Sequence, residues 1–464
     1  MPVTSQLVEQ QRPQRKHPPG PRGNLRELLS SLLFGSSQNN LDVLMNAARD
    51  FGDVVRFPGG SRAPYFINHP DFVKHILQEN NRNYCKQNRF NDLFKPFIGE
   101  GLLTNDGEAW RRRRRLAQPA FHRQRLSLLV KLMTDTVKEI IARWKTAVEK
   151  GQPIDLLVQM QRVALTIVGR ALFSTEVEDD VEKMARRSQD ILEYINHRTN
   201  YLLSLPEYIP TRRNHRAMQA LHKSDEDIYR TIRTRRQNQE DHDDLLSMLL
   251  AVRDEETGAG LSDKELRDEM QTFMGAGNET TAATLGWAWY LLSRHPEVDR
   301  RFRSELREVL GGRTPTFEDL PQLRYTRMII DETLRLYPPA WAMSRTAISD
   351  DDIGGYHIPA GALVLVSQYV IQRDPRFWDN PEGFDPERCT PERSEKRPRY
   401  AYFSFGGGPR QCIGNEFALM EATLVLATVA QKYRLHLVPG HPVEPYPIFT
   451  LRPRHGVLMT VHEA

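Results

Sequence analysis

The sequence predicts a mainly α-helical protein that carries small β-sheets, an α+β fold. Most of the 464 residues fall in runs whose apolar positions repeat with helical spacing. Short apolar runs beside proline and glycine lie near both ends of the chain and are typical of strands and hairpins. The longest helical run, Ser262 to His295, spans roughly 50 Å at 1.5 Å per residue, enough to cross the whole molecule.

The bulk composition is that of a soluble globular protein. Hydrophobic residues make up 39% and charged residues 27% of the chain. The net charge of +4 is too small for this length to indicate a nucleic-acid partner, so we expect none. The three cysteines, Cys85, Cys389 and Cys412, are too few for a disulfide framework. They fit a reducing compartment, and we expect a cytoplasmic location.

Length alone suggests about three domains, but no linker rich in serine or glycine divides the chain. We therefore expect a polar tail and proline-rich hinge at residues 1–35 and a single domain at 36–464. No run approaches the roughly 20 apolar residues of a membrane span, so we expect no transmembrane anchor. Leu25 to Phe34 is short and amphipathic; we expect it to pack on the body, with contact to a membrane surface as the alternative.

The N-terminal part predicts two helices around a β-hairpin. The expected elements are a helix at Leu41–Phe51, strands at Val54–Phe57 and Pro64–Ile67, and a helix at His69–Gln78. The stretch from Asn80 to Asn105 is predicted to be irregular. Its aromatic residues need an apolar neighbour, either the core or a hydrophobic ligand; they include Phe90, Phe94 and Phe97.

A helix expected from Gly107 to about Gln118 contains five consecutive arginines, Arg111 to Arg115. These cannot all face one way on a helix of 3.6 residues per turn. Trp110 and Arg114 are i,i+4 neighbours and share a face. The other four arginines are expected to project to solvent or toward other neighbours.

Further long helices are predicted in the middle of the chain. They are expected at Gln124–Lys150, Leu156–Leu172, Val181–His197 and Arg213–Asn238. Ser262 and Glu265 form a plausible capping box at the start of the longest helix. In its middle, Gly275 and Gly277 remove side chains and make room for a flat group, so we expect the helix to be locally opened there.

The last third predicts a helix at Asp319–Tyr337 that ends at two prolines. Glu332 and Arg335 share one face of it as i,i+3 partners. A turn at Gly354–Gly361, a strand with a short helix across Val364–Ile371, and β-like structure at Tyr446–Val461 complete the chain.

A glycine-rich stretch, Phe405 to Gly414, carries Cys412 immediately before the helical run Phe417–Tyr433. Glycines let a backbone bend sharply and approach a flat ligand closely. The N-terminal end of a helix favours a sulfur anion. One cysteine is a poor zinc site, which requires four ligands, but a good axial ligand for haem iron. A buried core cysteine in a glycine-rich turn is the alternative.

Taken together, these motifs resemble those of the cytochrome P-450 monooxygenases. The haem-loop pattern Phe-x-x-Gly-x-Arg-x-Cys-x-Gly is matched by Phe405, Gly408, Arg410, Cys412 and Gly414. The oxygen-activation pattern is matched by Ala276, Gly277, Glu279, Thr280 and Thr281. The Trp-x-x-x-Arg and Glu-x-x-Arg motifs fall on Trp110 with Arg114 and on Glu332 with Arg335, and Arg388 completes a charge triad. Cys389 stands where the family commonly has phenylalanine or tryptophan.

The resemblance implies a cytochrome P-450 fold around heme b (iron protoporphyrin IX), with Cys412 as the metal ligand. It assigns the other cofactor-binding positions to Trp110, Arg114, Ala276, Gly277, Arg345, Phe405, Arg410 and Gly414. Thr280 and Glu279 are the implied catalytic pair, which hydrogen-bonds dioxygen and relays protons. The triad is assigned to folding and haem retention.

The implied reaction inserts one atom of dioxygen into a small hydrophobic substrate, by hydroxylation or epoxidation, possibly of a fatty acid or terpenoid. The family would place Phe405–Gly414 opposite the long central helix and a lid over the connection 202–211. Electrons are expected from a ferredoxin or flavodoxin with an NAD(P)H reductase, docking on the arginine-rich helix. A peroxide-driven peroxygenase of the same fold and a non-catalytic haem-binding sensor or carrier remain the alternatives.

Overall fold

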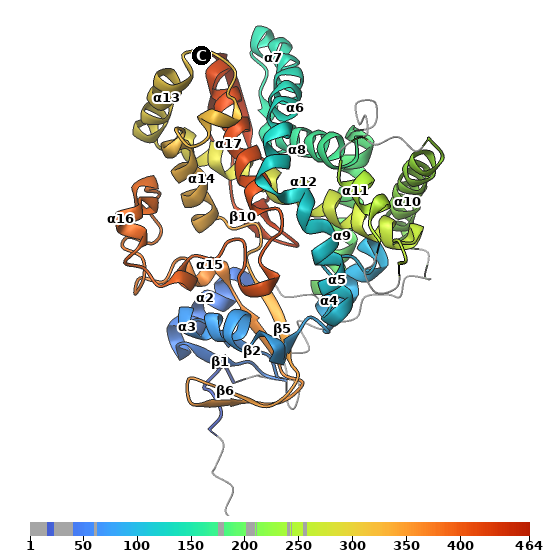
Figure 1. Cartoon of the computed structure of the whole chain (residues 1–464). Coiled ribbons are helices and arrows are strands. Elements are labelled where there is room, and N and C mark those ends of the chain that lie inside the picture. The colour runs from blue at the N-terminus through green and yellow to red at the C-terminus, as the bar shows by residue number, and fades with distance from the viewer. Residues whose placement is uncertain are drawn as a thin grey trace, which may run out of the picture.

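The computed structural model describes residues 16–22, 40–59, 63–174, 181–200, 209, 211–238, 242, 244–253 and 258–464. The amphipathic run Leu25–Phe34 and most of the connection 202–211 lie outside the described residues. Within them, long helices make up most of the fold, and the strands β1, β2, β5 and β6 gather with α2 and α3 at one end (Figure 1).

The described residues of the N-terminal half form short strands and the helices α2 to α11. Their bounds are α2 (Asn40–Phe51), β1 (Val54–Arg56), β2 (Tyr65–Ile67), α3 (Pro70–Lys74), β3 (Tyr84–Cys85), α4 (Arg89–Ile98), α5 (Gly107–Ala117), α6 (Arg123–Ala142), α7 (Lys145–Lys150), β4 (Ile154–Asp155), α8 (Leu156–Phe173), α9 (Val181–Asn200), α10 (Arg212–Asn238) and α11 (Leu245–Ala251).

The C-terminal half begins with the longest described helix. Its elements are α12 (Asp263–Arg294), α13 (Pro296–Leu310), α14 (Arg324–Leu336), β5 (Met343–Ala347), β6 (Asp351–Ile353), β7 (Tyr356–Ile358), β8 (Leu363–Val366), α15 (Gln368–Ile371), α16 (Pro391–Ser394), α17 (Asn415–Lys432), β9 (Tyr433–Leu437), β10 (Pro445–Pro447), β11 (Leu451–Pro453) and β12 (Leu458–Glu463).

The strands form one larger sheet and three small ones. The larger sheet has the order β1-β2-β8-β5-β3, and its β2–β8 pair is parallel. The hairpin β10–β11 pairs Pro445 with Pro453 and Pro447 with Leu451. Strands β1 and β2 pair antiparallel, Val54 with Ile67 and Arg56 with Tyr65. The predicted α+β class and the predicted N-terminal hairpin are therefore confirmed.

The backbone bounds correct four predictions. The stretch 80–105 is not irregular, because α4 forms within it, capped by the Asn88 side chain, which accepts from the Asn91 N–H. The helix at Gln124–Lys150 is interrupted at Arg143 and Trp144, and the helix beginning at His69 continues from His75 as a π-helix to Glu79. The helix predicted from Asp319 begins only at Arg324, after a separate 3₁₀ turn at Phe317–Asp319. Helices α11 and α13 were not predicted.

Helix α12 is the centre of the helical core. Its capping box is present as predicted, with Ser262 and Glu265 each satisfying the other's backbone N–H. Leu285, Trp287 and Ala288 on its C-terminal half are 0% exposed. Helices α8, α14 and α17 contribute to the same apolar cluster, so α12 is enclosed over much of its length.

Helix α8 is the one described helix that is long and apolar enough to cross a membrane by length and composition. The helix has 18 residues, and 72% of them are buried inside the protein. Met160, Val163 and Ile167 belong to the main core cluster with α12. This helix is therefore a core element of the fold.

The proline-rich segment before the first helix contacts the strand-rich end. The Pro19 carbonyl accepts from the Arg56 N–H at 2.9 Å, and the Lys16 carbonyl accepts from the His357 N–H at 3.1 Å. A Cβ on Gly20 would lie 1.9 Å from the Arg56 carbonyl oxygen, so only glycine fits this approach. The boundary of the domain at residue 36 stays a prediction.

Candidate haem-binding and catalytic site

The loop that carries Cys412 is fixed by its glycines. Gly406 and Gly408 adopt φ values of +71° and +63°, which side-chain-bearing residues rarely adopt. A Cβ on Gly408 would lie 1.8 Å from the Leu77 carbonyl oxygen, and the loop therefore packs directly on the π-helix. The Cys412 N–H donates to the Phe405 carbonyl at 3.0 Å and closes the loop.

Cys412 is exposed, two residues before Gly414, which is the N-cap residue of α17. The protein packed around its thiol raises the thiol pKa, whereas the Gly414 N–H and the Arg114 charge lower it. The net direction of the pKa shift is upward because burial outweighs the helix end, although the Gly414 N–H acts in the direction that we expected. A bound metal ion deprotonates a coordinating thiol outright, and this chemistry does not depend on a low intrinsic pKa.

Ala276 and Thr280 of helix α12 are more exposed than the buried residues between them. Ala276 is exposed and Thr280 is partly exposed, although the neighbouring Asn278 and Glu279 are buried. The Thr280 hydroxyl donates to the Ala276 carbonyl at 2.6 Å. The helix is continuous through this point, so the predicted local opening is wrong.

The two glycines of this segment have different surroundings. A Cβ on Gly275 would meet no atom within 4 Å, which agrees with open space on that side. A Cβ on Gly277 would lie 2.7 Å from the Val168 side chain of α8. Gly277 therefore allows α8 and α12 to approach closely, and the space beside it is filled by Val168 and not left for a flat group.

Glu279 is 4% exposed and its carboxylate points toward two other elements. Its Oε1 accepts from the Thr450 hydroxyl at 3.0 Å and lies 3.6 Å from an Arg452 nitrogen. Its Oε2 accepts from the Gln161 side-chain amide of α8 at 3.3 Å. Thr280, by contrast, donates to its own helix, so the side chains of the predicted catalytic pair are adjacent in sequence but bind different partners.

A group of cations lies between the cysteine loop, β5 and the segment before α5. Arg410 donates to the Asn105 carbonyl at 2.7 Å and pairs with Asp106, and its guanidinium lies 4.1 Å from the centre of the Trp110 ring. Arg345, 9% exposed, donates to the Ser344 carbonyl at 2.8 Å. Burial and the nearby Arg410 lower the pKa of Arg345 to about 10, and Asp106 opposes this shift.

Lys86 belongs to the same group but was not predicted. Its ammonium donates to the Leu103 carbonyl at 2.9 Å. Burial, Arg345 and Arg410 lower the pKa of Lys86 well below its ordinary value, again opposed by Asp106. Three cations thus share the single carboxylate of Asp106 in a poorly hydrated place, an arrangement that favours binding of further negative charge.

Arg114 lies beside the cysteine loop, as the motif implied. It donates to the Gln411 carbonyl at 2.9 Å, and burial lowers its pKa whereas Cys412 raises it. The structure brings Trp110 and Arg410 into contact directly. Asp106, the N-cap residue of α5, was missed; the signal that could have found it is its position just before the Gly107-Glu108 helix start.

These residues fit a haem. The exposed Cys412 offers a thiol, and the cation group of Lys86, Arg345 and Arg410 matches a ligand with carboxylate arms. The exposed Ala276, on a helix that is otherwise largely buried, leaves a surface against which a flat group can lie. The donor set is one thiol, and the described residues hold no group of three or more His, Cys, Asp or Glu side chains suited to a metal ion.

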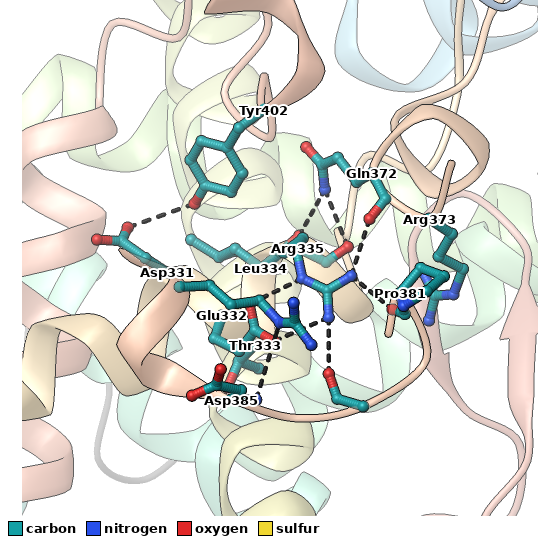
Figure 2. Close-up of polar contacts among 12 residues, drawn as sticks. Asp331, Glu332, Thr333, Leu334, Arg335, Gln372, Arg373, Pro381, Asp385 and Tyr402 are labelled. Atoms are coloured by element: carbon teal, nitrogen blue, oxygen red, sulfur yellow. Dashed lines mark hydrogen bonds and ion pairs between the residues drawn. The ribbon is translucent and has the colours of Figure 1, made fainter. Parts of the chain in front are cut away.

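The predicted charge triad is present and buried (Figure 2). Glu332 accepts from Arg335 at 2.7 and 2.8 Å, and Arg388 lies 3.3 Å from the same carboxylate. The Asp385 N–H also donates to Glu332, at 3.1 Å. Arg335 in addition donates to three backbone carbonyls, those of Gln372, Pro381 and Gly383, and so ties α14 to the chain that leads to the cysteine loop.

The arginine-rich helix α5 divides its charges in a way that the sequence did not show. Arg113 is 7% exposed and pairs with Glu269 of α12 at 2.9 Å, so of the two expected directions it takes the one toward a neighbour. Arg112 pairs with Glu265 at 3.2 Å. Arg111 and Arg115 remain exposed and line a surface hollow of about 310 Å³ with Trp110, Arg114, Gln118, Pro119 and His122.

Comparison with known proteins identifies this arrangement. A family model described as Cytochrome P-450 matches residues 18–460. The chain is similar to cyclooctat-9-en-7-ol 5-monooxygenase of Streptomyces melanosporofaciens, with 38% identity over 84% of each chain. It is also similar to pentalenene oxygenase of Streptomyces avermitilis, with 36% identity over 88% of this chain and 89% of that protein.

A solved structure, the heme domain of cytochrome P-450DA, shares the fold with a TM-score of 0.87. The alignment covers 97% of this chain and 98% of that one, at 26% identity.

Proposed function

Because the chain belongs to the cytochrome P-450 family, we propose that it oxidises a cyclic terpenoid with electrons supplied by a separate acidic redox protein. It is a haem-thiolate monooxygenase of bacterial type that acts on apolar substrates, and its cofactor is haem b. The observation that carries the finer proposal is that two of its relatives are named for reactions on cyclooctat-9-en-7-ol and pentalenene.

When bound, the haem supplies dioxygen activation and oxygen transfer, with the cysteine ligand favouring cleavage of the O–O bond. In this chain, Cys412 would bind the iron. Arg345, Arg410 and Lys86 would bind the carboxylate arms, because these three positive groups share the carboxylate of Asp106. Arg114, beside the cysteine loop, would bind them as well. Thr280 and Glu279 would hold and deliver protons on the α12 side.

Two phenylalanines would line the apolar side of the substrate pocket. Phe94 of α4 and Phe449 of the β10–β11 turn pack with ring centroids 4.9 Å apart, and both are only partly buried. Phe97, in contrast, is 1% exposed and packs on Tyr194 of α9, so it serves the core. The Phe90 side chain lies outside the part of the protein that the structure describes. A large ring-shaped hydrocarbon suits such an aromatic surface through area burial alone.

Titration of the oxidised protein with candidate substrates tests the substrate class. Pentalenene and cyclooctat-9-en-7-ol are expected to shift the Soret band with saturation, and a long-chain fatty acid such as palmitate is expected to shift it much less. The matched variants Phe94→Ala and Phe97→Ala separate the pocket from the core. Phe94→Ala should weaken terpene binding in this titration directly, whereas Phe97→Ala removes a core side chain and should not. A shift with palmitate alone would favour a fatty acid hydroxylase.

Replacing Thr280 by alanine is expected to uncouple the enzyme. With surrogate ferredoxin and reductase, product per NADPH should fall about 10-fold and peroxide should rise by the corresponding amount, because a proton donor is lost from the α12 side. Thr284→Ala is the matched control, since its hydroxyl makes the same type of bond to the carbonyl four residues earlier, at 2.9 Å. Equal coupling in Thr280→Ala and wild type would remove Thr280 from the relay and favour the peroxygenase alternative.

The redox partner is proposed to dock on the exposed cations beside the hollow on α5. Charge reversal at Arg111 and Arg115 is expected to slow reduction by an acidic ferredoxin roughly 10-fold at low salt, and added salt should diminish the difference. Stopped-flow reduction measures this effect, and Arg434→Glu on β9 controls for the change in net charge. A rate insensitive to both substitutions and to salt would exclude this docking surface.

A cytoplasmic location is also proposed. The three cysteines are all free, which agrees with a reducing compartment. Fractionation of the native host with antibody detection tests this location.

A further inference from the structure

The carboxylate of Glu279 is bound by residues outside its own helix. Thr450 and Arg452 hold Oε1 and Gln161 holds Oε2, at 3.0, 3.6 and 3.3 Å respectively. Glu279 and Thr450 are 4% and 2% exposed, so water does not replace these partners easily. A buried carboxylate needs such donors, because an unpaired charge in a poorly hydrated place is costly.

Thr450 lies in the short turn between β10 and β11, and Arg452 follows it as the second residue of β11. The same turn carries Phe449, whose ring contacts Phe94 at the proposed substrate surface. The segment 448–452, which covers this turn and the start of β11, therefore connects an apolar residue at the proposed substrate surface with two polar residues that bind the Glu279 carboxylate.

The turn is itself attached to rigid parts of the core. The Trp287 indole N–H of α12 donates to the Leu451 carbonyl at 3.0 Å, and the Trp341 indole N–H donates to the Ile448 carbonyl at 3.0 Å. The Leu451 N–H donates to the Pro339 carbonyl at 2.9 Å. These bonds fix the backbone on both sides of Phe449 and Thr450, so the side chains of the turn are the parts free to respond to a ligand.

We propose that the segment 448–452 positions Glu279, because Thr450 and Arg452 bind its carboxylate and keep it away from Thr280. Contact of the substrate with Phe449 would couple substrate binding to the strength of these two interactions. The inference rests on the proposed function, in which Glu279 delivers protons. It assigns Thr450 and Arg452 as positioning residues, because both act through the Glu279 carboxylate.

The C–O stretching band of the reduced carbon monoxide complex gives a readout that does not require turnover. This band responds to charge on the α12 side of the haem. Thr450→Val and Arg452→Gln are expected to shift it, because a released carboxylate can turn toward that side. Thr450→Ser retains the hydroxyl and should restore the wild-type band.

A double-mutant cycle shows whether the shift passes through Glu279. In the Glu279→Gln background, Thr450→Val should produce no additional shift, because the charge that it would release is absent. The matched controls are Arg454→Gln, whose partner in the same hairpin is Glu444 at 3.6 Å, and Thr460→Val on β12. Both controls should leave the band unchanged.

Coupling measurements give the second readout. With pentalenene, surrogate ferredoxin and reductase, Thr450→Val and Arg452→Gln are expected to lower product per NADPH roughly 10-fold, because a carboxylate without its fixed partners no longer delivers protons from one defined position. A tenfold loss is the size of one lost hydrogen bond to a charged group. Phe449→Ala should weaken the change that pentalenene causes in the C–O band of wild type, and this weakening should disappear in the Glu279→Gln background.

The outcomes separate this inference from the proposed function. A C–O band that shifts equally in Thr450→Val with and without Glu279 would overturn the positioning role, whatever the substrate proves to be. An unshifted band in both Thr450→Val and Arg452→Gln would overturn it as well. Failure of wild type to oxidise either terpene, with the band shifts as expected, would overturn the substrate class and leave the positioning role supported.

Discussion

Replacement of Glu332 by alanine is expected to give a protein without haem. Glu332 and Arg335 are 0% exposed and Arg388 is 3% exposed, so the substitution leaves two buried guanidinium groups without their shared carboxylate. Breaking a buried ion pair on one side costs about 3–5 kcal/mol. This is a large fraction of the roughly 5–15 kcal/mol that stabilises a typical domain.

The effect should reach the cysteine loop through the backbone. Arg335 donates to the carbonyls of Gln372, Pro381 and Gly383 (Figure 2). The Gln372 side chain in turn accepts from the Phe403 N–H at 3.0 Å, two residues before the loop. Misplacement of Arg335 therefore disturbs the chain that positions Phe405 and Cys412. We expect loss of haem even in protein that remains folded.

The ratio of Soret to protein absorbance and the thermal unfolding midpoint measure these two effects. The matched control lies on the same helix: Arg327 is 44% exposed on its side chain and pairs with Asp331 at 3.0 Å. Arg327→Ala should change stability by less than about 1 kcal/mol and keep its haem, whereas Arg335→Ala should behave like Glu332→Ala. A Glu332→Ala protein with full haem content and normal turnover would refute the structural role of the triad.

The sequence predicted best the features whose cause is local. The Cys412 loop depends on positive φ values at Gly406 and Gly408, which only glycine adopts readily, and the i,i+3 pair of Glu332 and Arg335 follows from helix geometry. The capping box at Ser262 is equally local.

Features that depend on distant partners were missed or left open. The sequence did not decide whether Arg113 faces solvent or a neighbour, because its acidic partner Glu269 lies 156 residues away on α12. Lys86 and Asp106 join the cation group only because β3, β5 and the cysteine loop meet in space. The direction of the Glu279 side chain is set by Thr450, 171 residues further along the chain.

The helix α4 was missed for another reason. Its sequence contains Pro96 inside the helix and several polar residues, which lower the helical signal, but Asn88 provides the N-cap. The cap was the signal that could have found it.

Replacement of Cys412 by alanine is expected to abolish the thiolate signature of the bound haem. Cys412 is the cysteine exposed at the loop, and its N–H is bonded to the Phe405 carbonyl, so the backbone should survive the change. Cys389 supplies the matched control: burial raises its thiol pKa well above the ordinary value, and it lies on the 3₁₀ turn Pro386–Cys389 beside the triad. Cys389→Ala should retain the signature.

The spectrum of the reduced protein with carbon monoxide tests most directly whether Cys412 holds the haem iron as a thiolate. Wild type and Cys389→Ala are expected to show the red-shifted Soret band typical of a thiolate ligand, and Cys412→Ala is expected to lack it. An unshifted band in wild type, or a red-shifted band that persists in Cys412→Ala, would contradict the account.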